Sequence, residues 1–115
     1  HIPILAACVL NDRQGKADNA REFKVPGSWM MVDSRRIRDL FRKYRNVRLC
    51  LSGHMHQLDR VEFEGVTYIC DGAVSGAWWK GPNDHCAEGY GVVDLSSDGR
   101  WSHEYQVYGW KAETG

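Results

Sequence analysis

The feature that most constrains this chain is the segment Leu-Ser-Gly-His-Met-His at residues 51–56. A mostly apolar, partly β-branched run at residues 47–51 leads into it and predicts a strand. If the chain stays extended past Gly53, alternation puts His54 and His56 on one face and Met55 on the other. Two imidazoles on one side of a strand end form a metal-ligand pair. Two unrelated surface histidines can have the same spacing by chance. The surrounding sequence therefore has to distinguish a metal site from such a pair.

Length and charge narrow the possible classes. The 115 residues suit one small domain or part of a larger one, and 43% hydrophobic residues with five tryptophans suffice for a core. The 15 basic and 15 acidic residues cancel, so nothing global indicates nucleic acid or a membrane as partner. The apolar runs are too short to span a bilayer. Because residues 1–5 read as the end of a buried strand or the loop just after it, we expect the carboxy-terminal part of a longer protein. The compartment stays undecided.

Hydrophobic periodicity predicts one helix followed by four antiparallel strands. Residues 34–45 carry Ile37, Leu40, Phe41 and Tyr44 at i, i+3, i+4 and i+7, which is one apolar stripe. Residues 7–32 show no sustained period and are interpreted as a loop or lid. Beyond the histidines, the predicted strands cover residues 58–63, 66–70, 89–95 and 100–108, with a hairpin turn at Glu64-Gly65. The fold class is therefore α+β.

Two further features leave alternatives open. The outer face of the helix is strongly basic, which is compatible with a phosphate-binding or nucleic-acid surface, but no aromatic residues interleave with those charges. The sequence therefore carries no strong nucleic-acid signal. The four cysteines have no zinc-finger spacing, and they suit either buried thiols or one to two disulfides. They are Cys8, Cys50, Cys70 and Cys86.

The histidine segments resemble those of a known family. His1-Ile2-Pro3, followed by a helix and then by an apolar strand ending in Ser-Gly-His-Met-His at residues 52–56, resembles the last two metal motifs of the calcineurin-like metallophosphoesterases. Residues 72–79 and 88–95 are similar to segments of bacterial members. The resemblance covers essentially the whole chain. It implies the carboxy-terminal half of an αββα sandwich and hydrolysis of a phosphomonoester or phosphodiester at a binuclear centre.

The resemblance also implies where the ligands lie. His1 and His54 would bind one divalent ion and His56 the other, with Mn, Fe, Zn or Ni all compatible with imidazole. The family's earlier motifs, Asp-x-His, Gly-Asp-x-x-Asp and Gly-Asn-His-Asp/Glu, do not occur here. No catalytic residue is therefore identified, and the chain alone is expected to be inactive. Asn11 and Trp78 are candidates for substrate contact, whereas His85 and His103 are interpreted as ordinary surface or strand histidines.

A different class remains as the alternative. The chain would then be a non-catalytic, β-rich binding module whose histidines are incidental. The two hypotheses differ in whether divalent ions are retained in stoichiometric amounts.

Overall fold

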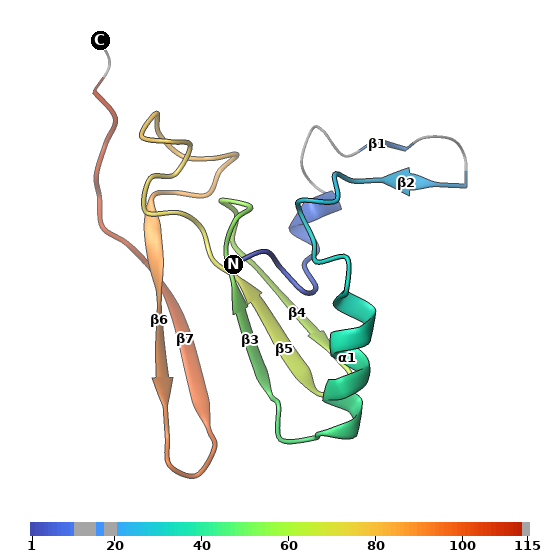
Figure 1. The fold of residues 1–115 in the computed structure, drawn as a ribbon. Helices are drawn as coiled ribbons and strands as arrows, with labels where there is room; N and C mark the ends of the chain where they lie inside the picture. The colour runs from blue at the N-terminus through green and yellow to red at the C-terminus, as the bar shows by residue number, and fades with distance from the viewer. Residues whose placement is uncertain (11–15, 18–20, 114–115) are drawn as a thin grey trace.

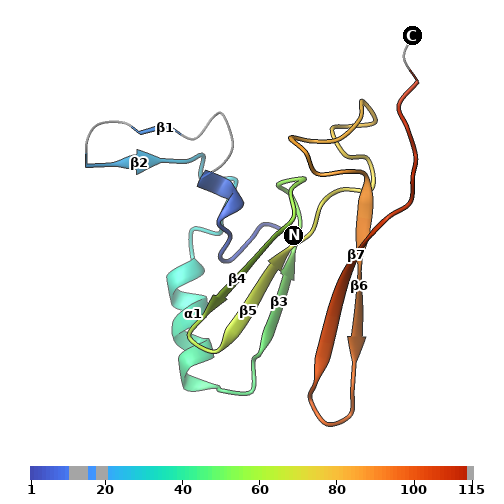
Figure 2. The same ribbon diagram turned by 180° about the vertical axis from the view of Figure 1, so that it is seen from behind.

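The computed structural model describes residues 1–10, 16–17 and 21–113, and it has the mixed helix and strand content expected of an α+β chain (Figures 1 and 2). A 3₁₀ turn at Cys8–Leu10 precedes the first strand. The elements are β1 (Lys16–Ala17), β2 (Phe23–Lys24), α1 (Ser34–Lys43), β3 (Leu49–Ser52), β4 (Asp59–Phe63), β5 (Val66–Cys70), β6 (Gly89–Leu95) and β7 (Trp101–Val107). The turn and the pair β1–β2 lie within the predicted lid, and Asn11 lies outside the described residues.

The strand β5 is the centre of the main sheet. It pairs in parallel with β3 and antiparallel with β4, so the order is β3-β5-β4. The predicted hairpin turn is confirmed: Glu64 and Gly65 have φ of 52° and 81°, the left-handed pair that two-residue hairpins use. The four predicted strands form two antiparallel pairs, β4–β5 and β6–β7, which lie in separate sheets, and β5 also pairs in parallel with the earlier strand β3. Sequence patterns do not reveal which earlier strand a central strand pairs with.

The strands β6 and β7 form a separate antiparallel hairpin, which both views place beside the β3 side of the main sheet (Figures 1 and 2). Tyr105 anchors it, because its hydroxyl donates a 2.7 Å hydrogen bond to the Ala87 carbonyl. The Tyr105 ring lies directly over Gly72 and Gly89, where a Cβ atom would collide with it. Glycine is therefore required at both positions for the hairpin to dock.

The cluster of buried residues lies at the carboxyl end of β5. Cys70, the last residue of β5, is fully buried and packs with Ala6, Cys8, Val9 and Met55. The end of the predicted lid packs against this cluster through Val25, Trp29 and Met30. A backbone hydrogen bond of 2.8 Å from Met31 to Pro3 fixes that segment to the first residues.

The apolar stripe of the helix α1 is only partly buried. Ile37 and Phe41 are half-buried, whereas Leu40 and Tyr44 are 50% and 55% exposed. The helix instead turns basic side chains toward the β4–β5 turn. The Arg38 guanidinium lies 5.7 Å from the Phe63 ring centroid, and Arg42 bonds to Glu64. Both arginines therefore lie over the β4–β5 turn, where Leu40 and Tyr44 do not pack.

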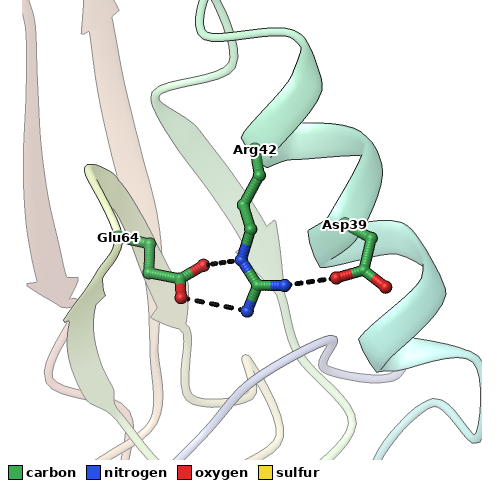
Figure 3. Close-up of polar contacts among 3 residues, drawn as sticks. All are labelled: Asp39, Arg42 and Glu64. Atoms are coloured by element: carbon green, nitrogen blue, oxygen red, sulfur yellow. Dashed lines mark hydrogen bonds and ion pairs between the residues drawn. The ribbon is translucent and has the colours of Figure 1, made fainter.

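Figure 3 shows how Arg42 joins helix and sheet. Its guanidinium donates to Asp39 on the same helix and to both carboxylate oxygens of Glu64, one of them at 2.9 Å. These hydrogen bonds raise the pKa of Arg42 and lower the pKa of Glu64. Part of the basic helix face is therefore neutralised within the molecule, which weakens its case as a nucleic-acid surface.

The molecule is flat and exposes much surface. Its principal extents are 53 × 45 × 18 Å, and its radius of gyration is 15.8 Å, against roughly 13 Å for a compact chain of this length. The accessible surface is 8184 Å², whereas a compact 13.1 kDa protein has roughly 6,400 Å². Within the described residues, no helix is long and apolar enough to cross a bilayer.

Candidate metal centre

Two predicted ligands, His1 and His54, lie next to each other at the carboxyl end of β3. Their ring centroids are 5.1 Å apart, and the ring planes are nearly perpendicular at 84°. A 2.9 Å backbone hydrogen bond from Gly53 to the His1 carbonyl brings them together. The His1 ring lies over Gly53, with its Nδ1 and Cε1 atoms 3.7 Å from where a Cβ would be. The structure thus joins residues that are more than fifty positions apart in the chain.

This spacing fits two nitrogen ligands of one ion. With metal–nitrogen distances of about 2.0–2.1 Å and tetrahedral angles, two imidazoles on Zn²⁺ have ring centroids roughly 5 Å apart. The observed 5.1 Å agrees with that arrangement. His1 also lines a small pocket of about 120 Å³ beside β3, next to Leu51 and Ser52. An ordinary edge-to-face contact between two rings has the same spacing, and His54 does not line this pocket.

The turn that carries His54 and His56 differs from the predicted extended strand. The strand β3 ends at Ser52, and the Met55 amide donates a 2.8 Å hydrogen bond back to the Gly53 carbonyl, which closes a γ-turn. His54 has φ of 71° and His56 has φ of 55°, both left-handed. The prediction that strand alternation directs both rings is therefore wrong. Met55 is buried in the core cluster, and this anchors the turn.

His56 lies in a separate environment from the His1–His54 pair. Its Nδ1 is 2.5 Å from the Gly76 carbonyl oxygen, and its ring stacks on Trp78 at a centroid distance of 4.4 Å. A carbonyl oxygen only accepts hydrogen bonds, so Nδ1 carries a proton, and in the neutral imidazole the lone pair is then on Nε2. A hydrogen bond of this kind on the far nitrogen is what orients metal-binding histidines. The ring of His56 is thus oriented so that the lone pair of Nε2 can bind a metal ion.

Asn83 supports His56 from the backbone side. Its side-chain amide donates a 3.1 Å hydrogen bond to the His56 carbonyl. Asn83 and Cys86 exchange two 2.9 Å backbone hydrogen bonds across Asp84 and His85, which are both left-handed. This tight turn leaves His85 exposed at its tip, as its interpretation as a surface histidine required. Sequence reasoning did not single out Asn83 or Gly76, whose contacts span 27 and 20 residues.

The described carboxylates do not complete the histidine set. Within residues 1–10, 16–17 and 21–113, no group of three or more histidine, cysteine, aspartate or glutamate side chains is placed to hold an ion. Asp59 accepts a 2.6 Å hydrogen bond from the Cys8 amide. Asp71, at the end of β5, is 2.7 Å from Nε2 of His103 on β7. Both carboxylates are therefore hydrogen-bonded to groups other than the three candidate histidines.

The Asp71–His103 pair was not predicted as a unit. The side chains are 21% and 10% exposed, and Gly91 makes room for Asp71, since a Cβ at Gly91 would collide with its carboxylate. The pair joins the β6–β7 hairpin to the main sheet, so the interpretation of His103 as an ordinary strand histidine missed its interaction with Asp71.

The four cysteines are free thiols in the structure. A hydrogen bond with Cys70 and burial in the core raise the pKa of the Cys8 thiol. Burial also raises the pKa of Cys50 and of Cys86. Protonated thiols are weak metal ligands and weak nucleophiles. Among the described residues, none of these thiols belongs to a group of three or more side chains placed to hold an ion.

The sequence and the structure were compared with protein-family models, with curated proteins and with solved structures, and none of the three comparisons gave a match.

Proposed function

We propose that this chain supplies the histidine ligands of a two-metal site that hydrolyses a phosphomonoester or phosphodiester. In this proposal the chain is the carboxy-terminal half of an αββα sandwich. The single observation that carries it is the contact of His1 with His54 at the end of β3, at the spacing of two ligands of one ion. His56, with a free Nε2, is the ligand of the second ion. This division of the three histidines is the one that the resemblance implied.

Each histidine has a defined part in such a site. Two bound divalent ions would supply a hydroxide of lowered pKa and neutralise the phosphoryl oxygens. The γ-turn holds His54 in a strained conformation beside His1, so little reorganisation is needed when ligand is bound. The Gly76 carbonyl fixes the tautomer and the ring orientation of His56 and increases the basicity of Nε2.

The remaining ligands come from a second polypeptide segment. Neutral histidines leave the charge of two dications uncompensated, and carboxylates are needed to offset it. The excess exposed surface supports such a partner segment, because it includes large apolar side chains on α1 and β3. These are Leu40, Tyr44 and Leu51, each at least half exposed. The segment would carry the Asp-x-His, Gly-Asp-x-x-Asp and Gly-Asn-His motifs that the chain lacks.

Metal binding by the chain itself tests the first part. Titration calorimetry with Zn²⁺ or Mn²⁺ should show at most one weakly bound ion per chain. His54→Ala and His1→Ala should each weaken that binding by at least about 100-fold. His85→Ala, which removes an exposed histidine in a turn, is the matched control and should leave binding unchanged. Binding that survives His54→Ala at full affinity would contradict the site.

Hydrolysis of an activated aryl phosphate ester tests the second part. The 115-residue chain should show no turnover, whereas a longer polypeptide that also carries the missing motifs should hydrolyse the ester. In that longer form, His54→Ala and His56→Ala should each reduce kcat/KM by at least about 100-fold. A longer form that retains no stoichiometric metal would favour the alternative, a β-rich binding module. Turnover by the chain alone, abolished by the same variants, would show that no second segment is needed.

A further inference from the structure

The loop between β5 and β6 exposes two adjacent tryptophans. Trp78 and Trp79 are 68% and 55% exposed, and both have left-handed backbones with φ of 53° and 66°. A left-handed conformation is unfavourable for a bulky residue. Exposing two large indoles to water forgoes the free energy that their burial would contribute. Fold stability therefore does not explain this arrangement, and such outliers cluster at ligand sites.

The loop is held in one conformation by short-range hydrogen bonds. The Trp79 amide donates to Ser75 at 2.7 Å, and the Ala77 amide donates to Gly81 at 2.8 Å. Gly76 packs so closely that a Cβ atom would collide with the Gly81 carbonyl. The Tyr108 hydroxyl adds a 2.6 Å hydrogen bond to the Val74 carbonyl from beyond β7. The two indoles are thus presented on a preorganised turn, which lowers the entropic cost of binding a ligand.

The exposed indoles are continuous with the candidate metal centre. Trp78 stacks on the His56 ring at 4.4 Å with an interplanar angle of 31°, and the carbonyl that orients His56 belongs to Gly76 in the same loop. Trp79 contacts Trp110 edge-on at 5.3 Å, which extends the aromatic surface toward the carboxyl end. A group attached to a phosphate near His56 would therefore lie beside Trp78, and Trp79 is the next residue of the same loop.

We propose that Trp78 and Trp79 bind the planar ring of a nucleoside phosphate, so that the substrate class is nucleotides. The position of the phosphate in this inference rests on the proposed function. The contact with the ring rests only on the structure of the loop that carries the two tryptophans. An exposed indole offers a flat π surface, and both faces of a nucleobase stack on such surfaces. Stacking on one aromatic side chain contributes a factor of roughly 5 to 150 in affinity. A ribose phosphate without a base would lack this contribution.

Binding of adenosine 5′-monophosphate and of ribose 5-phosphate to the 115-residue chain tests the inference. Titrations are followed by the indole N–H resonances in nitrogen-15 spectra. One series contains a chelator, and the other contains Zn²⁺, which is chosen over Mn²⁺ because it is diamagnetic. The nucleotide should shift the Trp78 and Trp79 signals, and it should bind at least about 5-fold more tightly than ribose 5-phosphate. Phenyl phosphate separates a general aromatic preference from a nucleobase preference, and tighter binding of phenyl phosphate would overturn the nucleotide assignment.

Variants make the result specific to the loop. Trp78→Leu and Trp79→Leu should each lower nucleotide affinity by at least about 5-fold, whereas Trp78→Phe should retain part of it. Tyr90→Leu removes a 47% exposed aromatic ring on β6 and serves as the control for losing any surface aromatic. Circular dichroism checks that each variant is folded. Unchanged affinity in both leucine variants, or equal affinity for the two phosphates, overturns the inference.

The two proposals fail in different ways. Nucleotide-induced shifts of Trp78 and Trp79 in the presence of chelator support the ring contact even if no metal binds to His54. Metal-dependent hydrolysis in the longer polypeptide at equal kcat/KM for the nucleotide and for ribose 5-phosphate overturns the ring contact and leaves the metal site standing.

Discussion

The strands β5 and β6 each contain four apolar residues but differ strongly in burial. Four of the five residues of β5 are buried, with Ile69 only 1% exposed, whereas β6 alternates and leaves Leu95 77% exposed. The difference follows from pairing and packing. β5 is hydrogen-bonded on both edges and carries the core cluster around Cys70, while β6 has β7 as its partner within the described sheets.

This contrast shows how the two regions are stabilised. The main sheet depends on apolar burial, which is the largest favourable term in folding. The β6–β7 hairpin depends on a few specific contacts, since a two-stranded ribbon is marginally stable by itself. Those contacts are the Tyr105 packing on Gly72 and the Asp71–His103 pair. The candidate histidines lie where the regions meet, with His54 at the end of β3 and His56 against the loop that leads to β6.

The largest expected effect is in the main sheet. Ile69→Ala should lower the free energy of unfolding by roughly 2–5 kcal/mol, because it removes a fully buried side chain and leaves a cavity. Leu95→Ala, in the hairpin, should change it by less than about 0.5 kcal/mol, because the side chain is already in water. Chemical denaturation of the two variants checks this. Similar losses for both would show that the contrast in burial does not reflect the energetics.

An intermediate effect is expected at the hairpin anchor. Asp71→Ala and His103→Ala should each destabilise by roughly 1–3 kcal/mol, because each leaves a largely buried polar partner unpaired. A double-mutant cycle should show that the two losses are not additive. Asp94→Ala, on the exposed face of β6, is the control. Additive losses would mean that the pair does not couple the hairpin to the sheet.

The smallest effect is expected at the exposed ion pair of the β4–β5 turn. Arg42 holds the pKa of Glu64 below its ordinary value of 4.5, so this stabilisation is present above about pH 4.5 and is lost as the pH falls through the lowered pKa. Glu64→Gln should therefore lower the Tm slightly at pH 7, less at high salt, and not at all once the carboxyl is protonated. Glu104→Gln on β7 is the exposed control. A Tm difference between Glu64→Gln and the unmodified protein that persists in acid would show that the ion pair with Arg42 is not its cause.

Local patterns predicted the elements well. The strands β5 and β6 begin and end at the predicted residues, and the Glu64-Gly65 turn has the left-handed backbone that its sequence indicated. The helix was predicted at residues 34–45 and is observed at Ser34–Lys43. These features depend on interactions within a few residues, such as side-chain periodicity and turn conformation, which a short window of sequence contains.

The apolar stripe of the helix α1 shows what local sequence patterns do not predict. The spacing of Ile37, Leu40, Phe41 and Tyr44 correctly indicates a helix, but it does not determine which of them the sheet covers. In the structure Arg38 and Arg42 face Phe63 and Glu64, while Leu40 and Tyr44 are half exposed.

For the candidate site, the sequence by itself determined the residue types and the presence of a glycine before the two histidines. Only the tertiary structure decided that His1 lies against His54, that a γ-turn replaces the extended strand, and that His56 bonds to Gly76. Asp71 likewise meets His103 across 32 positions of the chain. The physical reason is that backbone propensities act over a few neighbouring residues, whereas a side chain's partners are set by how distant elements pack, and that packing depends on the whole chain at once.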